Sequence, residues 1–297
     1  MSDCAAILYL HAVTSLHPGS GTALGVVDLP VQRERHTAWP LVPASSLKGV
    51  LREALRKPLG GNGEWKAIFG PDTANASEHA GAVTFTDARL LAFPVRSLKG
   101  VFAWVTCKAV LDRYARDLTL ADIKPDWLAL TVEPKPGEML AAKDSPLLIE
   151  ANAALLEEFD FVRTDDVAQV ADWLSRHAGM DAAAQQRLRT HLVVLNDSDF
   201  THFAVHATEV IARVGIVPET RTVRDGALFY EEFLPPETLL YAVVLASASR
   251  RHDIALSSTA ILDKLESVMP KILQIGAGET IGKGLVAASL RRAEVRQ

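Results

Sequence analysis

PASSLKGVLREALR, residues 43–56, is the stretch from which the architecture of this chain can be worked out. Ser45 or Ser46 is expected to cap a helix here, because a hydroxyl can accept a free amide of the first turn. Lys48, Arg52 and Arg56 follow at four-residue spacing and form a basic row on one face. The apolar residues recur at the spacing of another face, and they are Leu47, Val50, Leu51, Ala54 and Leu55. The pattern predicts a helix from about residue 45 to residue 57.

Strands are expected on both sides of this helix. Residues 4–14, CAAILYLHAVT, are mostly apolar with β-branched and aromatic members, and they indicate a first strand. Residues 82–92 and 100–106 indicate two further strands, and residues 107–117 indicate a second helix. The glycine-rich segment between them, residues 58–81, is expected to be irregular.

The second half of the chain repeats this alternation. HLVVLND at 191–197 indicates a short buried strand, and Ser198 is expected to cap a helix that runs to about Arg213. A strand at 238–246, a helix at 257–268 and a final pair of strands around a glycine loop follow. The order β-α-β-β-α-β, with a hairpin and helices added, predicts an α+β fold with a ferredoxin-like (RRM-type) core, and not a doubly wound sheet.

Composition is that of a folded domain with a large core. The chain has 297 residues, of which 48% are hydrophobic and 23% are charged. It has no apolar run long enough to cross a membrane and no secretory signal at its start. Cys4 and Cys107 are too far apart to indicate a disulfide framework or a cysteine zinc site. These features lead us to expect a cytoplasmic protein.

Charge is unevenly distributed along the chain. The net charge of −5 argues by itself against a nucleic-acid partner. However, six basic residues and only two acidic ones lie between Arg33 and Lys57, whereas the segment from Asp144 to Asp181 is strongly acidic. A concentrated cationic face on an acidic body is compatible with a polyanionic partner.

Two segments have the chemistry of an anion site. The start of the first helix offers free backbone amides, the hydroxyls of Ser45 and Ser46, and Lys48 one turn inside. GAGETIGKG at 276–284 is a glycine-rich loop that lets another backbone approach closely. Its spacing matches neither a Walker A loop nor a dinucleotide-binding fingerprint. The alternatives are a capped helix with a solvated basic row and a simple glycine-rich hairpin turn.

A long loop from residue 16 to residue 43 contains the candidate catalytic residues. Its length favours a functional or mobile segment over a plain connection. Asp28 could bind a hydrated magnesium ion if a substrate phosphate supplied further oxygens, and His17 could act as a general base or donate to a phosphate. The alternatives are that Asp28 is a turn residue and that His17 is structural.

Two further features of the sequence offer candidate sites. His202 and His206 are four residues apart on a predicted helix, but Phe203 occupies the place of a zincin glutamate and no third ligand follows, which disfavours a zinc site. Residues 216–235 predict an apolar β-hairpin with an Asp-Gly turn at residues 225–226. Its apolar side chains could part stacked bases of a bound strand, or they could pack its base.

Six sequence segments resemble, in the same order along the chain, segments of the RAMP superfamily of CRISPR-associated proteins. They are LHPGSG, VVDLPVQRERHT, PASSLKGVLREAL, VTFTDARLLAFPVRSLKGVFAWVT, TVRDGALFYEEFLPPETLLY and IGAGETIGKGLV. Within that superfamily they are most similar to the multi-copy backbone subunit of the type III-B (Cmr) RNA-targeting effector complex. The resemblance leaves mainly residues 140–190 uncovered. Ala44 and Ala277 depart from it, because the family often has glycine at both positions.

The resemblance implies a fold and an assembly. It implies a single RRM-like domain over residues 1–297, in which a palm carries a flexible loop at 16–43, a helical insertion at about 140–190 and a hairpin thumb at 216–235. Copies of such a subunit would stack head to tail in a contact that does not close. The implied partners are guide CRISPR RNA, single-stranded target RNA and the other Cmr subunits, with no membrane. The residues expected to hold guide RNA are Ser45, Ser46, Lys48, Arg52, Gly276, Gly278, Gly282, Lys283 and Gly284.

The implied activity is metal-dependent endoribonuclease cleavage within the assembled complex, at regular intervals along the target. Asp28 matches the aspartate that the family uses for this cut, and it would bind the divalent ion, for which we expect magnesium. His17 is a secondary catalytic candidate. Three alternatives remain: a non-catalytic guide-binding scaffold with cleavage by a partner subunit, a metal-independent guide-processing nuclease using His17, and an unrelated small-molecule enzyme.

Overall fold

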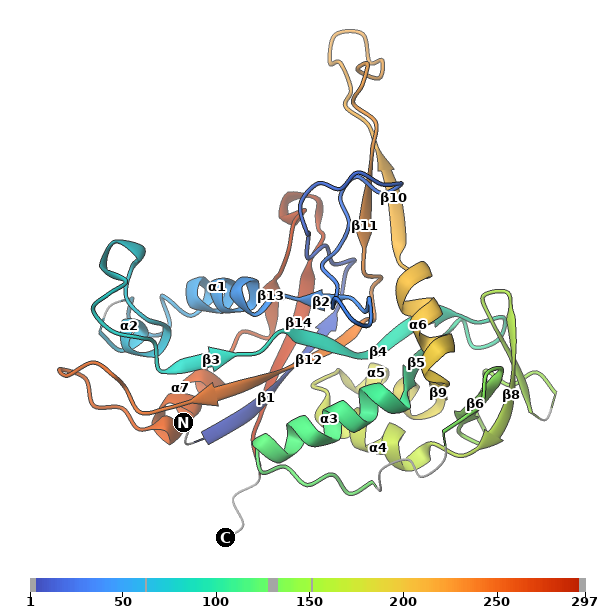
Figure 1. Ribbon diagram of the computed structural model, residues 1–297, viewed down its shortest axis with the longest axis horizontal. Coiled ribbons are helices and arrows are strands. Elements are labelled where there is room, and N and C mark those ends of the chain that lie inside the picture. The colour runs from blue at the N-terminus through green and yellow to red at the C-terminus, as the bar shows by residue number, and fades with distance from the viewer. Residues whose placement is uncertain (1–3, 62, 128–132, 151, 294–297) are drawn as a thin grey trace.

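A large mixed sheet with helices around it forms the body of the molecule (Figure 1). The computed structural model describes residues 4–61, 63–127, 133–150 and 152–293. The sheet has the strand order β13-β14-β1-β12-β4-β5-β9-β6-β8-β7, with β2 beside β4 and β3 beside β12. The sheet strands are β1 (Cys4–Ala12), β2 (Leu41–Val42), β3 (Val83–Phe85), β4 (Ala88–Arg96), β5 (Phe102–Cys107), β6 (Glu138–Ala141), β7 (Ala153–Leu156), β8 (Phe159–Asp165), β9 (Leu192–Leu195), β12 (Leu239–Ala246), β13 (Ile272–Gln274) and β14 (Leu285–Arg291).

The chain combines this large mixed sheet with α-helices, so the predicted α+β class is confirmed. The α-helices are α1 (Ala44–Ala54), α2 (Gly63–Phe69), α3 (Lys108–Leu120), α4 (Ala168–His177), α5 (Ala182–His191), α6 (Asp197–His206) and α7 (Ser258–Val268). Two short 3-10 helices, η1 (Thr73–Asn75) and η2 (Glu279–Ile281), lie in loops. None of the helices in the described ranges is long and apolar enough to cross a membrane.

Strand β1 lies in the interior of the sheet, and its composition explains why. It pairs antiparallel with β12, from Cys4 opposite Ala246 to His11 opposite Leu239, and on its other edge antiparallel with β14. All residues of β1 after Ala5 are buried. A nearly continuous apolar run suits a strand that is covered on both faces, since neither face can carry alternate polar residues without burying them.

The start of α1 differs from the prediction. Pro43 occupies the N-cap position and makes no side-chain cap, while Ser45 and Ser46 lie exposed inside the first turn. The carboxylate of Asp87 accepts the amide of Ala44 at 2.8 Å instead. Because this acceptor comes from a distant segment, no pattern within residues 43–56 could indicate it. The helix itself is confirmed, and it buries Leu47 and Leu51 as the apolar spacing predicts.

Other secondary-structure predictions need correction. The expected helical insertion at 140–190 is helical only in α4 and α5, because β7 and β8 precede them and pair with one another. The alternating sequence FDFVRTD suits a strand with one buried side, and β8 extends the sheet beside β6. Within the segment 58–81, α2 buries Trp65, Ile68 and Phe69, whose spacing is that of one helical face. The segment is therefore more ordered than predicted.

The predicted helix after residue 198 ends early and is followed by a strand. α6 ends at His206, and its N-cap is Asn196, whose side chain accepts the amide of Ser198 at 3.0 Å. Residues 209–213 form β10 (Glu209–Arg213), because EVIAR pairs antiparallel with β11 (Phe229–Phe233). β10 and β11 make a separate two-stranded sheet that projects from the body of the molecule (Figure 1).

The projecting hairpin turns at its far end around residues 217–222. There the amide of Val217 donates to the carbonyl of Thr222 at 2.9 Å, and the amide of Arg221 donates back to Val217 at 2.8 Å. The predicted Asp-Gly turn exists, but it lies on the returning arm, where the amide of Ala227 bonds to the carbonyl of Arg224. The tip was misplaced because Asp-Gly is the stronger local turn signal.

Candidate nucleic-acid interface

The long loop at 16–43 is attached along the base of the projecting hairpin. The amide of Leu16 donates to the carbonyl of Leu234 at 2.9 Å, and Leu29 exchanges backbone hydrogen bonds with Tyr230 and Glu232 at 3.0 Å each. Leu29 is thereby paired in parallel with Glu231 of β11. The loop therefore pairs along one edge of the hairpin (Figure 1), and this pairing brings Asp28, the residue before Leu29, to the hairpin base.

Asp28 lies at this edge and remains accessible. Its Oδ2 accepts the amide of Tyr230 at 2.7 Å, and its own carbonyl accepts the amide of Ala23 at 2.9 Å. The side chain is only partly buried, and residues 21–26 next to it are exposed. In the described part of the chain Oδ1 has no hydrogen-bond donor. One carboxylate oxygen therefore fixes the orientation of Asp28, and the other is free for a ligand.

His17 lies at the base of the same hairpin but is buried. Its Nδ1 donates to the carbonyl of Glu232 at 2.5 Å, because a carbonyl can only accept. Its Nε2 is 3.9 Å from Oε1 of Glu231, and the ring packs 5.4 Å from that of Phe233. A Cβ at Gly19 would lie 2.7 Å from Nε2, so glycine is needed to cover this edge of the ring. The histidine is held in one orientation by these contacts.

Glu231 and Glu232 are the acidic neighbours of this site, and the sequence offers them as candidates to assist Asp28 only if the hairpin base lies near the loop. Glu232 is buried and accepts from the amide of Val31 at 2.9 Å, from Arg33 at 2.5 Å and from Thr208 at 2.7 Å. Glu231 is also buried, and its Oε2 lies 2.7 Å from Nε of Arg213. Glu232 therefore holds the loop to the hairpin, whereas Glu231 pairs with an arginine of the opposite hairpin strand. The adjacent glutamates in FYEEF were their only sequence signal.

The donor set suits a hydrated metal ion and does not suit a cage built by the protein alone. No group of three His, Cys, Asp or Glu side chains in the described ranges is arranged to hold an ion. Asp28 offers one free oxygen, whereas Glu231 and Glu232 are paired with arginines. Magnesium commonly keeps several waters and binds through one or two carboxylates together with substrate phosphates. The site fits an ion of that kind.

The glycine loop 276–284 packs against the segment that leaves β1. The amide of Ala277 donates to the carbonyl of His17 at 3.1 Å, and the amide of Gly284 donates to that of Ser15 at 2.9 Å. Nζ of Lys283 lies 3.1 Å from Oγ of Ser15 and 4.9 Å from the centre of the Phe233 ring. The loop and its lysine are therefore brought to the base of the hairpin, beside the loop that carries Asp28.

The basic residues of α1 have different surroundings. Nζ of Lys48 lies 3.4 Å from the carbonyl of Val83, and burial, together with the nearby charge of Arg52, lowers its pKa. Arg52 donates to the carbonyls of Gly70 and Pro71 at 2.7 and 3.1 Å, and its guanidinium lies 4.1 Å from the Trp65 ring centre. The structure therefore uses Arg52 to hold the α2 segment.

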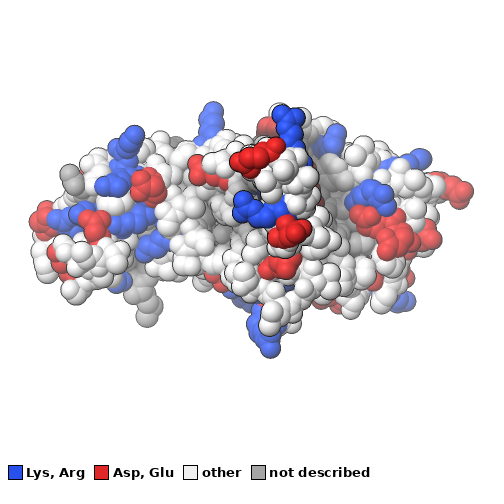
Figure 2. All heavy atoms as spheres, turned by 90° about the horizontal axis from the view of Figure 1, so that it is seen from above, with Lys and Arg blue, Asp and Glu red and all other residues white. Residues whose placement is uncertain are grey.

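The predicted phosphate-binding elements are neighbours in space. α1 packs against β13, from which the glycine loop leads to β14, so the two candidate anion sites lie on adjoining elements (Figure 1). Figure 2, which views the hairpin end-on, shows acidic side chains gathered at the end of the molecule with β6–β8. At the opposite end, with α1 and α2, basic and acidic side chains are interspersed. Part of the acidic end reaches the hairpin base, because Glu157 and Glu158 line a pocket with Thr208, which donates to Glu232.

His202 and His206 lie apart from the site around Asp28. Their rings are 4.8 Å apart on the exposed face of α6, and the ring of His202 contacts that of Phe159. Glu157 and Glu158 line the same shallow pocket. These residues are not among groups of three ligands that could hold a metal in the described ranges.

Comparison with known proteins connects this geometry to a family. The sequence pattern of the RAMP superfamily matches residues 9–287. The CRISPR system Cmr endoribonuclease Cmr4 of Pyrococcus furiosus is 39% identical over 288 residues, which cover 95% of this chain and 94% of that protein. The crystal structure of oligomeric Cmr4 from Pyrococcus furiosus superposes with a TM-score of 0.72 at 28% identity and 98% coverage of both chains.

A more distant structure has the same fold. A cryo-EM structure of the type III-B Cmr-beta complex bound to cognate target RNA contains a chain that superposes with a TM-score of 0.76. The two chains are 24% identical, and the match covers 97% of this chain and 98% of that one. At this identity the likeness is one of fold.

Proposed function

The chain belongs to the RAMP superfamily, and from that premise we propose that it is a backbone subunit of a type III-B (Cmr) CRISPR effector complex that binds guide RNA and cleaves complementary target RNA. The proposal depends on one observation. Three features that were expected from separate parts of the sequence lie together at the hairpin base. An accessible carboxylate at Asp28, a glycine loop with Lys283, and a projecting hairpin meet there. The identity to an endoribonuclease over almost the whole chain supports the same function.

We propose that the palm of this subunit is ferredoxin-like. The strands β14, β1, β12 and β4 lie side by side and antiparallel, α1 lies in the connection from β1 to β4, and α7 in that from β12 to β14. This is the β-α-β-β-α-β connectivity expected of an RRM-type core. On this proposal the whole chain is one domain, and the remaining strands and helices are additions to the palm, with β10 and β11 as the thumb.

Cleavage on this proposal depends on how the residues of the chain hold the target. Asp28 presents its free oxygen at the hairpin base, with its orientation set by the amide of Tyr230. A divalent ion, magnesium for preference, would be bound by Asp28 and would neutralise charge that builds on the scissile phosphate. The exposed apolar side chains of the thumb, which include Ile216, Val223 and Leu228, suit a wedge that extrudes a base. Extrusion would let the adjacent 2′-hydroxyl reach an in-line position that a regular duplex forbids.

The proposed assembly follows from the same features. The thumb projects from the body of its own subunit (Figure 1) and carries exposed apolar residues, which a second copy stacked head to tail could cover. The proposed partners are guide RNA, target RNA, further copies of the chain and the other Cmr subunits. Cytoplasmic location is proposed because the target of such a complex is intracellular RNA.

The test is an Asp28→Asn substitution in the reconstituted complex. Asparagine keeps an acceptor for the amide of Tyr230 but loses the charge, so the loop should stay in place. We expect guide and target binding to be unchanged, and target cleavage to fall by roughly a hundredfold or more, as for loss of a group that stabilises developing charge. Cleavage should also stop in EDTA and return with magnesium. The matched control is Asp160→Asn, an exposed aspartate on β8.

The alternatives give other results. Normal cleavage by the Asp28→Asn complex would contradict the catalytic role and favour a scaffold whose partner cuts. Full activity in EDTA that is lost on His17→Ala would favour the metal-independent nuclease. Purified protein with no affinity for RNA would favour a small-molecule enzyme.

A further inference from the structure

A groove rich in arginine lies between the loop at 33–36, β2, β4 and α3, away from Asp28 and from the glycine loop. Its volume is about 510 Å³. The residues that line it come from four separate stretches of the chain, and they are Arg33, Glu34, Arg35, His36, Leu41, Asp87, Arg89, Arg113 and Arg116. Five of these residues are arginines and two are carboxylates, and two further carboxylates, Asp117 and Glu232, pair with three of the arginines. The groove therefore carries a small excess of positive charge in a protein whose net charge is −5.

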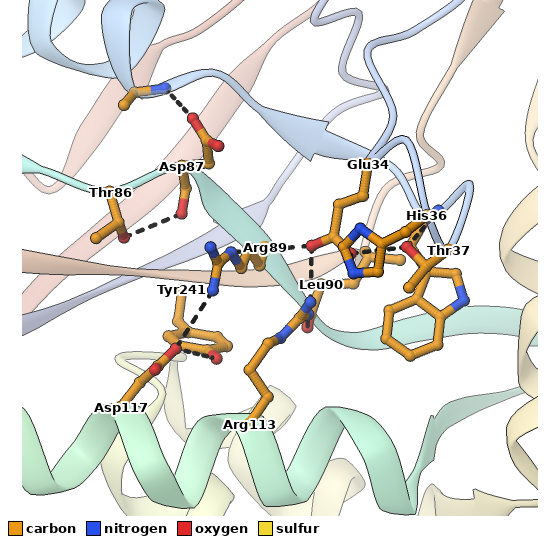
Figure 3. A network of polar contacts seen from close by, with 12 residues as sticks. Glu34, His36, Thr37, Thr86, Asp87, Arg89, Leu90, Arg113, Asp117 and Tyr241 are labelled. Atoms are coloured by element: carbon orange, nitrogen blue, oxygen red, sulfur yellow. Dashed lines mark hydrogen bonds and ion pairs between the residues drawn. The ribbon is translucent and has the colours of Figure 1, made fainter.

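The two carboxylates of the groove are already occupied by internal partners. Asp87 accepts the amide of Ala44 at the start of α1. Glu34 is buried and accepts from Arg113 and from the hydroxyl of Thr37, each at 2.7 Å. They therefore hold the walls of the groove in place, as Figure 3 shows, and they have little capacity left to bind a cation.

The arginines at the mouth of the groove have donors to spare. Arg89 lies between two carboxylates, 3.8 Å from Glu34 and 3.7 Å from Asp117 (Figure 3), and in the described ranges it makes no hydrogen bond with either. The side chain of Arg116 is 67% exposed, and two of its nitrogens donate to one oxygen of Asp117 at 3.4 Å. Arg35 is exposed and has no ion-pair partner within the part of the chain that the structure describes. Guanidinium groups so placed can bind an oxyanion through parallel hydrogen bonds.

We propose that this groove binds phosphodiester groups of the same RNA strand that the start of α1 holds, with Arg35, Arg89 and Arg116 as the contacting residues. The inference rests on the proposed function and extends it. The two sites are continuous, because Asp87 lines the groove and also binds the first amide of α1, next to the exposed Ser45 and Ser46.

The composition of the groove favours a nucleic-acid backbone over an acidic protein segment. Among the residues that the structure describes, Leu41 is the single apolar residue of its lining. Protein interfaces usually have an apolar core, whereas interfaces with nucleic acid are polar and strongly positive. Arg113, which is 12% exposed, is engaged with Glu34 and the carbonyl of Leu90, so it positions the groove and does not contact the ligand.

The test measures binding of the full chain to a labelled single-stranded oligouridine as a function of salt. The variant is Arg35→Glu with Arg116→Glu, because both side chains are exposed and their loss should not unfold the protein. A second variant, Arg89→Gln, probes the inner guanidinium. We expect the double variant to bind at least roughly tenfold more weakly, and the slope of log K against log salt to become shallower by about 1.4 for two lost phosphate contacts. The control is Arg96→Glu with Arg176→Glu, two exposed arginines outside the groove.

The possible results distinguish an RNA-binding groove from a protein-binding one and test the proposed function separately. Unchanged affinity and slope in both variants, with wild-type protein binding RNA, would overturn the groove and leave the proposed function intact. Unchanged RNA binding with loss of another complex subunit on co-purification would assign the groove to an acidic protein partner and overturn the inference. Wild-type protein with no salt-dependent affinity for RNA would overturn the proposed function and this inference with it.

Discussion

Gly276 shows how a single residue sets the position of the glycine loop. Its φ of +77° lies in the left-handed region, and a Cβ placed there would be 2.3 Å from the carbonyl oxygen of His17. The oxygen belongs to the backbone that also receives the amide of Ala277, so it cannot move aside without breaking that bond. The glycine is therefore required both by its backbone conformation and by the close approach of another segment.

Gly276→Ala should destabilise the protein through both effects. We expect the free energy of unfolding to fall by roughly 2–4 kcal/mol, from left-handed strain and from displacement of the loop. Urea denaturation of the full chain measures this loss. Gly282→Ala is the control, because its φ is +74° but nothing lies within 4 Å of its Cβ position, and strain alone should cost about 1 kcal/mol. Equal losses in the two variants would contradict the close-contact argument.

At the scale of elements, a buried ion pair joins the long loop to the hairpin. The side chains of Arg33 and Glu232 are 20% and 7% exposed, and the same carboxylate also accepts the amide of Val31 and the hydroxyl of Thr208. Arg33 further donates to the carbonyls of Ala38 and Ala204. The pair thus connects the loop, α6 and β11, and it determines where Asp28 stands relative to the thumb.

Glu232→Ala should release the loop from the hairpin. Arg33 and two further donors would lose their acceptor in a buried place, a change that costs about 3–5 kcal/mol. We expect faster hydrogen exchange at the amides of Leu29 and Val31, with little change in β1 and β12. Glu219→Ala, an exposed glutamate near the hairpin tip, should leave exchange unaltered. Exchange that quickens throughout the sheet would show instead that the pair stabilises the whole fold.

At the scale of the whole molecule, three buried tyrosines connect the sheet with the helices on it. Burial is the main cause that raises the pKa of Tyr114 to about 12, and it also raises the pKa values of Tyr9 and Tyr241. The hydroxyls of Tyr9 and Tyr114 are hydrogen-bonded, and that of Tyr241 donates to Asp117 below the arginine groove (Figure 3). The folded state therefore keeps these groups protonated at a pH at which the unfolded chain releases its protons.

Alkaline pH should unfold the protein through these tyrosines. The folded pKa exceeds the unfolded value of about 10, so the stabilisation is complete below pH 10 and is lost as the pH rises from about 10 to about 12. Urea denaturation at pH 8, 10 and 11, values chosen to bracket the onset, should show the free energy of unfolding falling only in the upper part of this range. Tyr114→Phe should make that fall less steep. An equally steep fall in the variant would rule out Tyr114 as a source of the pH dependence.

The amino-acid sequence by itself determined the elements whose signals are local and the family to which the chain belongs. The apolar spacing of residues 43–56 indicated α1, and the apolar runs at 4–14 and 238–246 indicated β1 and β12. The six sequence segments, taken in their order along the chain, indicated the superfamily. The sequence also singled out Asp28, and the structure places it in an accessible position next to the hairpin. Periodicity and turn chemistry depend on neighbours within a few residues, and this is why they were sufficient for these elements.

Only the tertiary structure decided which polar residues act together. Asp87 replaces a serine cap on α1, Arg52 is used to hold α2, and Glu232 clamps the long loop, each through a partner far away in the sequence. The groove needs Arg35, Arg89 and Arg116, which come from a loop, a strand and a helix. The pairing of distant charges depends on the sheet register and on helix packing, which no local pattern encodes. Isolated arginines in a sequence therefore give no indication of the site that they form when the sheet brings them together.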